Sequence, residues 1–199
     1  MSMSFEVFPT KKIIPKCNEV IKCSVGLFSE FMRREKIICD IEVTVSEILF
    51  TDKMYKTPIN LASKQDHYTV FNVNREGEIY VFYHDLTEVD KDFWDMELQD
   101  NKNAQVLNEK VNVNLEIGFF WSIKRTLGQP AIASLYYGYL AIAIAILTDG
   151  IIYSDDGAWE YSVFPVEGSV FKDIYLDIDK IHDATVKENI ETWLKKVKS

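Results

Sequence analysis

The sequence has few of the residue patterns on which common catalytic and metal sites are built. It contains three histidines, and none has a second histidine nearby, so the ligand spacing of a zinc site is missing. It has neither the GxGxxG nor the GxxxxGK[ST] pattern that cradles phosphate groups. Ser154, in the run YSDDG, lacks the flanking glycines of a hydrolase nucleophile. The sequence therefore carries no recognisable signature of a zinc enzyme, a nucleotide-binding enzyme or a serine hydrolase.

Cysteine is also scarce. The three cysteines, Cys17, Cys23 and Cys39, form no CxxC pair, and an odd number would leave one thiol unpaired in a secreted protein. The first residues, MSMSFEVFPTKKIIP, lack the continuous apolar core of a signal peptide. We therefore expect a reducing, cytoplasmic environment, with Cys23 and Cys39 filling the core and not acting as nucleophiles.

Basic residues are outnumbered. The 31 acidic and 22 basic residues give a net charge of -9, which repels nucleic-acid phosphates and anionic lipids. We expect no nucleic-acid or membrane partner, and a basic protein is the natural complement of such a surface. A hydrophobic content of 47% over 199 residues predicts one folded domain, spanning residues 1–199.

Hydrophobic periodicity predicts an α+β domain, in which one mostly antiparallel sheet packs against a few helices. Alternating patterns predict strands at residues 4–8, 40–50 and 114–125, and a β-hairpin over residues 67–86 that turns at residues 74–77. Helical spacing predicts helices at residues 16–35, 89–101 and 185–199. In the second helix we expect Asp90 as the cap and Phe93, Trp94 and Met96 as the apolar side. The pattern leaves residues 103–113 ambiguous.

A long uncharged run near residues 131–147 predicts a buried apolar helix. Ser134, Gly138, Ala141 and Ala145 fall at steps of four, three and four, so they form a stripe of small residues on one helical face. Such a stripe would allow the helix to lie close to the sheet. The longer uncharged segment from Leu127 to Thr148 contains Gln129, Pro130, Ser134, Gly138 and three tyrosines, which favour a core helix over a membrane span.

The run after this helix is rich in carboxylates. Asp155, Asp156 and Gly157 form a preferred hairpin turn, which would join strands at residues 151–154 and 159–164. The cluster Asp149, Asp155, Asp156 and Glu160 lacks the ligand spacing of a calcium loop. We therefore expect neither a bound metal nor a cofactor.

The block GQPAIASLYYGYLAIAIAILTDGIIYSDDGAWEYSVFP, residues 128–165, resembles the C-terminal block of small bacterial proteins, among them immunity proteins of polymorphic toxin systems. It covers about a fifth of the chain. The resemblance implies a bacterial cytosolic origin and an acidic, single-domain, non-catalytic protein that masks a basic toxin surface.

Two functional hypotheses follow. The first is a non-catalytic binding protein whose partner is a basic toxin or another basic protein, with Asp149, Asp155, Asp156, Trp159 and Glu160 as the binding residues. The same pattern also fits, and favours, a purely structural role, in which Trp159 belongs to the core and the aspartates form turns. The second hypothesis is a hydrolase-type enzyme whose clustered carboxylates act as general acid and base. A cleft that contains two or more carboxylates and a histidine would favour the enzyme. The oligomeric state does not follow from the sequence.

Overall fold

The computed structural model describes residues 3–49, 55–56, 58–61, 67–154, 163–181 and 183–198. The described residues form one antiparallel sheet of eight strands, in the order β3-β2-β4-β5-β6-β1-β7-β8. The strands are β1 (Met3–Phe8), β2 (Val43–Leu49), β3 (Tyr55–Lys56), β4 (His67–Val73), β5 (Gly77–Asp85), β6 (Phe119–Arg125), β7 (Ile151–Tyr153) and β8 (Val166–Glu167). The helices are α1 (Cys17–Arg34), α2 (Glu88–Asp100), α3 (Lys102–Val106), α4 (Asn108–Ile117), α5 (Ala131–Thr148), α6 (Gly168–Phe171) and α7 (Ala184–Lys198), with a 3₁₀ turn η1 (Ile178–Lys180). The expected α+β fold is confirmed.

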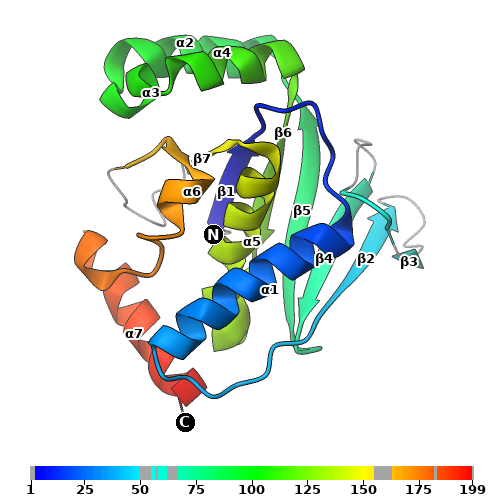
Figure 1. Ribbon diagram of the computed structural model, residues 1–199, viewed down its shortest axis with the longest axis vertical. Coiled ribbons are helices and arrows are strands. Elements are labelled where there is room, and N and C mark those ends of the chain that lie inside the picture. The colour runs from blue at the N-terminus through cyan, green and yellow to red at the C-terminus, as the bar shows by residue number, and fades with distance from the viewer. Residues whose placement is uncertain are drawn as a thin grey trace.

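Helix α5 is the centre of the core, as the apolar run predicts. It packs against one face of the sheet, and α1 packs against α5 (Figure 1). Alternate residues of the central strands point into this layer, among them Phe5 and Val7 of β1 and Trp121 and Ile123 of β6. Helix α5 is long and apolar enough to cross a membrane, but 83% of it lies buried within the protein, as in the core helix of a globular domain.

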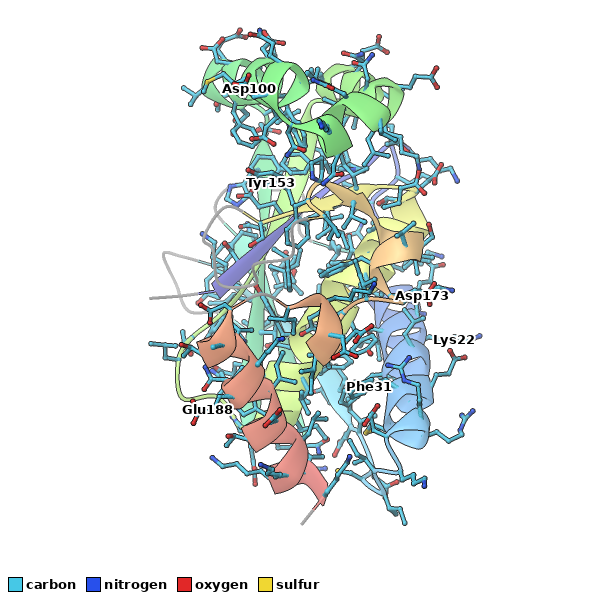
Figure 2. The ribbon with its side chains drawn as sticks, turned by 90° about the vertical axis from the view of Figure 1, so that its left-hand side faces the viewer. Lys22, Phe31, Asp100, Tyr153, Asp173 and Glu188 are labelled. Atoms are coloured by element: carbon cyan, nitrogen blue, oxygen red, sulfur yellow. The ribbon has the colours of Figure 1, made fainter. Side chains whose placement is uncertain are left out.

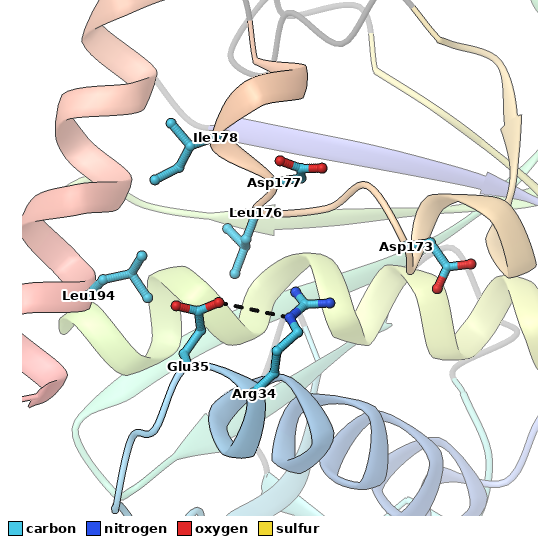
Figure 3. A pocket seen from close by; sticks show the side chains of 7 residues that line it. All are labelled: Arg34, Glu35, Asp173, Leu176, Asp177, Ile178 and Leu194. Atoms are coloured by element: carbon cyan, nitrogen blue, oxygen red, sulfur yellow. Dashed lines mark ion pairs between the residues drawn. The ribbon is translucent and has the colours of Figure 1, made fainter.

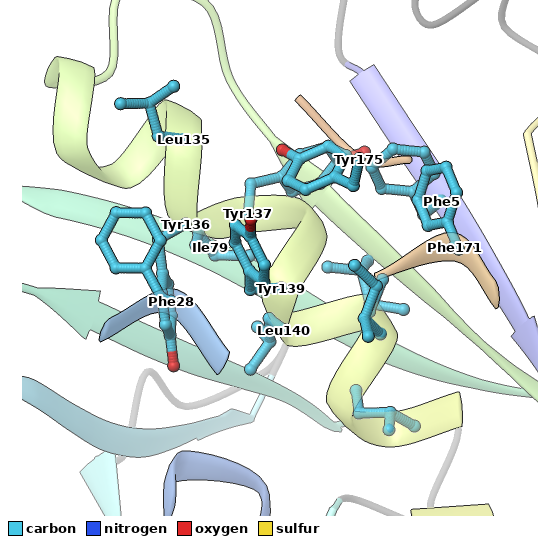
Figure 4. Close-up of a cluster of buried hydrophobic side chains, with 14 of the residues drawn as sticks. Phe5, Phe28, Ile79, Leu135, Tyr136, Tyr137, Tyr139, Leu140, Phe171 and Tyr175 are labelled. Atoms are coloured by element: carbon cyan, nitrogen blue, oxygen red, sulfur yellow. The ribbon is translucent and has the colours of Figure 1, made fainter. Parts of the chain in front are cut away.

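Aromatic side chains fill the space between α5 and its neighbours (Figure 4). The Phe28 ring of α1 meets the Tyr136 ring edge to face, with 5.6 Å between centroids. On another side of α5, the Tyr137 ring stacks on the Phe5 ring of β1 at 4.8 Å. These contacts bury large apolar areas and fix the helix against both the sheet and α1.

Part of the stripe of small residues on α5 packs against α6 and the segment that follows α6. An added Cβ at Gly138 would lie 2.2 Å from the Tyr175 ring, and one at Gly168, the first residue of α6, would lie 2.6 Å from the Ala145 Cβ. Gly138 and Ala145 therefore allow close approach of α6 and its following segment. Close approach to the sheet occurs at Ala133, outside the stripe, whose Cβ would be 2.3 Å from a Cβ at Gly77 of β5.

Helices α2 to α4 cover one end of the sheet (Figure 1). They close a second, smaller hydrophobic cluster that contains Phe8, Phe120 and Ile151 from the strands and Trp94 of α2. The Trp94 ring meets the Phe8 ring edge to face at 5.0 Å. This cluster uses the strand positions that alternate with those facing α5, so the sheet is buried on both faces at this end.

Several local predictions require correction. Asn114–Ile117, predicted as the start of a strand, instead ends helix α4, and Gly118 terminates that helix with a left-handed φ of 84°. The ambiguous residues 103–113 all lie in α3 or α4, except Leu107, which lies between the two helices. The cap of α2 is Thr87, whose hydroxyl accepts from the Asp90 N–H while the Asp90 carboxylate accepts from the Thr87 N–H. Met96, predicted on the apolar side, is exposed, whereas Trp94 is buried.

The predicted second strand after β7 falls mostly outside the described residues. Its last two residues, Val163 and Phe164, are not in a strand. Among the described residues β7 pairs with β8, where Ile151 lies opposite Glu167. The predicted Asp156-Gly157 turn also lies outside the described residues.

Candidate functional site

Asp149 is the one predicted binding residue that the structure describes, and it joins two parts of the fold. It ends α5 with a left-handed φ of 54°. Its carboxylate accepts a hydrogen bond of 2.8 Å from Lys110 Nζ of α4, and the same ammonium group lies 3.2 Å from Glu167 of β8. Lys110 also donates to the Asp149 carbonyl at 3.0 Å. Asp149 therefore holds α4 against the end of α5, and its role in binding stays a prediction.

The ion pairs of Lys110 with Asp149 and Glu167 shift the pKa values of Lys110 and Asp149. The hydrogen bond from Lys110 lowers the pKa of Asp149 and outweighs the opposing effect of burial. Burial lowers the pKa of Lys110, but its hydrogen bonds to Asp149 and Glu167 outweigh burial, so this pKa is raised. Both groups therefore stay charged over the neutral pH range.

The other predicted binding residues, Asp155, Asp156, Trp159 and Glu160, lie outside the described residues, and their role in binding stays a prediction. The residues on either side of this segment are anchored. Ser154 Oγ donates to the Ser4 carbonyl at 2.9 Å. On the other side, the Phe164 carbonyl accepts from Asn101 Nδ2 at 2.9 Å and from Asn103 Nδ2 at 3.3 Å.

These flanking residues lie next to α2. The Tyr153 ring of β7 meets the Phe93 ring of α2 edge to face at 5.0 Å, and its hydroxyl is 3.5 Å from Glu97 Oε1. Figure 2 shows Asp100, at the end of α2, above Tyr153. The fold thus brings an acidic helix next to both ends of the segment that carries the predicted binding residues. The sequence alone did not indicate that α2 lies beside this segment.

Helix α2 presents carboxylates and apolar side chains together. The stretch from Glu88 to Ile117 carries eight acidic and three basic side chains, a net charge of -5 out of the -9 of the chain. Val89 and Met96 are 75% and 65% exposed. We call the exposed side of this helix the α2 surface, and it consists of Glu88, Val89, Asp92, Asp95, Met96 and Asp100.

Most carboxylates of the α2 surface are not used by the fold. Glu88 pairs with Lys91 at 2.8 Å. Asp92, Asp95 and Asp100 have no hydrogen-bond or ion-pair partner among the described residues. The fold therefore gains little from these three charges, which remain available to a partner.

A groove lies at the other end of the molecule, between α1, the segment after α6, and α7. It holds a cavity of about 310 Å³ (Figure 3). Arg34, Glu35, Asp173, Leu176, Asp177, Ile178 and Leu194 line this cavity. Carboxylates therefore gather in a cleft, and among the described residues no histidine lines it.

The structure also pairs a histidine and a serine that the sequence analysis missed. His84 Nε2 lies 2.6 Å from Ser122 Oγ, and the His84 ring stacks on the Phe120 ring at 4.8 Å. Burial, followed by nearby Lys124, lowers the pKa of His84 against the opposing effect of Asp90. Ser122 is only 2% exposed, so its hydroxyl cannot reach a substrate in this conformation. Sequence spacing could not reveal the pair, because it depends on the register between β5 and β6.

The thiols are poor candidates for nucleophiles. Burial, with Glu47 nearby, raises the pKa of Cys17 to about 12, and burial raises the pKa of Cys23. Only the thiolate is a strong nucleophile, so both groups are unreactive at neutral pH. Cys17 is the buried cysteine, whereas Cys23 and Cys39, expected to fill the core, are half-buried. In the described parts of the chain, no group of three or more histidine, cysteine, aspartate or glutamate side chains could hold a metal ion.

Comparison of the chain with known protein families, with curated proteins and with solved structures finds no match.

Proposed function

We propose that this protein is a non-catalytic binding protein of the bacterial cytoplasm, an immunity protein that masks a basic toxin or another basic protein partner. The observation that supports this proposal is the α2 surface. Its exposed Val89 and Met96 lie among carboxylates, three of which have no partner within the described structure. An exposed apolar side chain that is surrounded by one sign of charge is suited to a partner of the opposite sign.

The two kinds of side chain would act at different stages of binding. Asp92, Asp95 and Asp100 would attract a basic surface over a Debye length of about 8 Å at physiological ionic strength. Val89 and Met96 would then be buried in the complex, where removal of apolar area from water opposes dissociation. The carboxylates would therefore control mainly the association rate, and Met96 mainly the dissociation rate.

The test uses the full-length protein and the product of the gene next to its own, which this proposal predicts to be a basic toxin. Association is measured by stopped flow at several salt concentrations. Replacing Asp92, Asp95 and Asp100 with asparagine should slow association about tenfold at low salt and flatten its salt dependence. Replacing Met96 with alanine should increase the dissociation rate about fivefold and leave association nearly unchanged.

A matched control removes the same number of charges elsewhere. The variant Asp179→Asn, Glu188→Gln, Glu191→Gln changes exposed carboxylates on η1 and α7, away from the α2 surface, and should bind like the wild type. Equal effects of the two triple variants would mean that net charge alone matters and would contradict the assignment to α2. Absence of any complex with the neighbouring gene product would contradict the immunity role.

A further inference from the structure

The groove between α1 and α7 contains two adjacent cavities. The first, of about 310 Å³, is the one in Figure 3. The second, of about 250 Å³, is lined by Leu27, Glu30, Phe31, Arg34, Tyr139, Lys172 and Asp173. Arg34 and Asp173 line both cavities, so one positively and one negatively charged side chain lie where the two cavities meet. The larger volume is at the lower end of the range for small-ligand sites.

Arg34, the last residue of α1, has an incompletely used guanidinium group. Its Nε lies 3.8 Å from Glu35 Oε1, and its central carbon lies 5.5 Å from the centre of the Phe31 ring. Glu35 is also 3.6 Å from Lys198 Nζ, so its charge is shared. The two terminal nitrogens of Arg34 have no hydrogen-bond or ion-pair partner in the described part of the chain. The two terminal nitrogens of a guanidinium group can bind both oxygens of a carboxylate through two parallel hydrogen bonds.

Asp173 provides the opposite charge. Asp173 is exposed, and its carboxylate has no hydrogen-bond or ion-pair partner among the described residues, Arg34 included. Asp177 lines the same cavity, and its Oδ1 accepts from the Asp179 N–H at 3.1 Å. Figure 3 shows these two aspartates on the segment that faces Arg34. The guanidinium group of Arg34 and the carboxylate of Asp173 thus line the same groove without an ion pair between them.

The rest of the first cavity is apolar. It is lined by Leu176 and Ile178 from the segment after α6 and by Leu194 of α7. Leu176 is buried and has a left-handed φ of 64°, which is rare for a bulky side chain. The packing around this buried side chain must therefore hold the backbone in this conformation.

We propose that this groove binds a small zwitterion, an α-amino acid with an apolar side chain. The ligand carboxylate would accept hydrogen bonds from the terminal nitrogens of Arg34, and its ammonium group would lie between Asp173 and Asp177. Its side chain would pack on Leu176, Ile178 and Leu194. A ligand with both charges uses Arg34 and the aspartates together, whereas a simple cation leaves the terminal nitrogens of Arg34 without an acceptor and a simple anion leaves Asp173 without a donor. This site is independent of the proposed protein partner.

The test compares leucine with two analogues that each lack one charge. Leucinamide keeps the ammonium group without the carboxylate, and 4-methylpentanoate keeps the carboxylate without the ammonium group. Binding is followed by methyl NMR of Ile178 and Leu194. Leucine should bind roughly tenfold or more tightly than either analogue, because each analogue loses a charge-assisted hydrogen bond. Equal binding of all three, or no methyl shifts at millimolar leucine, would overturn the proposal.

Two variants assign the charges to residues. Arg34→Gln should remove the preference for leucine over leucinamide, and Asp173→Asn should remove the preference for leucine over 4-methylpentanoate. The controls Arg33→Gln and Asp179→Asn alter exposed charges that do not line the cavities, and should keep both preferences. If the Arg34 and Asp173 variants discriminate as the wild type does, the leucine binds elsewhere and the assignment is wrong. None of these measurements involves the protein partner, so either proposal can fail alone.

Discussion

The backbone N–H of Gly138, in the middle of α5, donates a hydrogen bond of 3.1 Å to the Tyr175 hydroxyl. The Tyr175 ring occupies the space that a side chain at position 138 would need. Burial raises the pKa of Tyr175, so the hydroxyl stays protonated. The segment after α6, which forms one wall of the groove, is therefore attached to the central helix through this glycine.

Gly138→Ala should destabilise the protein by about 1 to 3 kcal/mol, because the added methyl group overlaps the Tyr175 ring. Urea denaturation measures the change. Gly26→Ala is the control, because nothing lies within 4 Å of a Cβ at that exposed position of α1. If the two variants have equal free energies of unfolding, the close contact is wrong.

A charge in the middle of α5 should prevent folding. Ala141 is completely buried, so Ala141→Asp would place a carboxylate in the core without a partner, at a cost of more than about 4 kcal/mol. Ile146→Asp introduces the same group on the same helix at a position that is 37% exposed, and should be tolerated much better. Circular dichroism and yield of folded protein distinguish them. A folded Ala141→Asp protein would show that α5 is not the centre of the core.

The ion pair of Asp149 with Lys110 should make a small, pH-dependent contribution to stability. The pKa of Asp149 is lower in the folded protein than in the unfolded chain, so its contribution is complete above the unfolded pKa and is lost as pH falls through the folded pKa. Because Asp149 is half exposed, the contribution should stay below about 1 kcal/mol at neutral pH.

Asp149→Asn isolates this effect, because asparagine also accepts the left-handed conformation. The difference in unfolding free energy between wild type and variant should be present at pH 7 and vanish in strong acid. The pKa of Lys110 is shifted in the opposite direction, upward. Its contribution to stability is therefore present at neutral pH and is lost at alkaline pH, as pH rises through the folded pKa. A difference that stayed constant from neutral to acidic pH would exclude the ion pair as its cause.

Thiol labelling should separate the cysteines by burial. Cys17 is buried and has a pKa of about 12, so a disulfide reagent at pH 8 should leave it unmodified in the native protein. Cys23 and Cys39 are both half-buried, but burial raises the pKa of Cys23, so Cys39 should react first. Mass spectrometry identifies the modified residue, and denaturation should expose all three thiols. Rapid native labelling of Cys17 would show that the start of α1 opens readily.

The sequence alone predicted the elements whose signal is local. Helices α1, α5 and α7 and the β4–β5 hairpin follow from apolar spacing over many residues, and each was predicted at nearly its observed position. The error at Asn114–Ile117 also has a local cause, because this segment is rich in strand formers. Its helical state depends on Val111 and Asn114, which are buried against other parts of the fold, and on Gly118.

Only the tertiary structure determined which residues lie together. Arg34, Asp173 and Leu194 are distant in sequence, and they share a cavity because α6 and its following segment pack closely against α5. The exposure of Met96 and the position of α2 beside Tyr153 and Phe164 likewise depend on how α2 to α4 cover the end of the sheet. Periodicity shows that a helix has a buried face, but it does not identify the partner of that face. Burial, pairing and cavity shape arise from packing between segments, which no local pattern specifies.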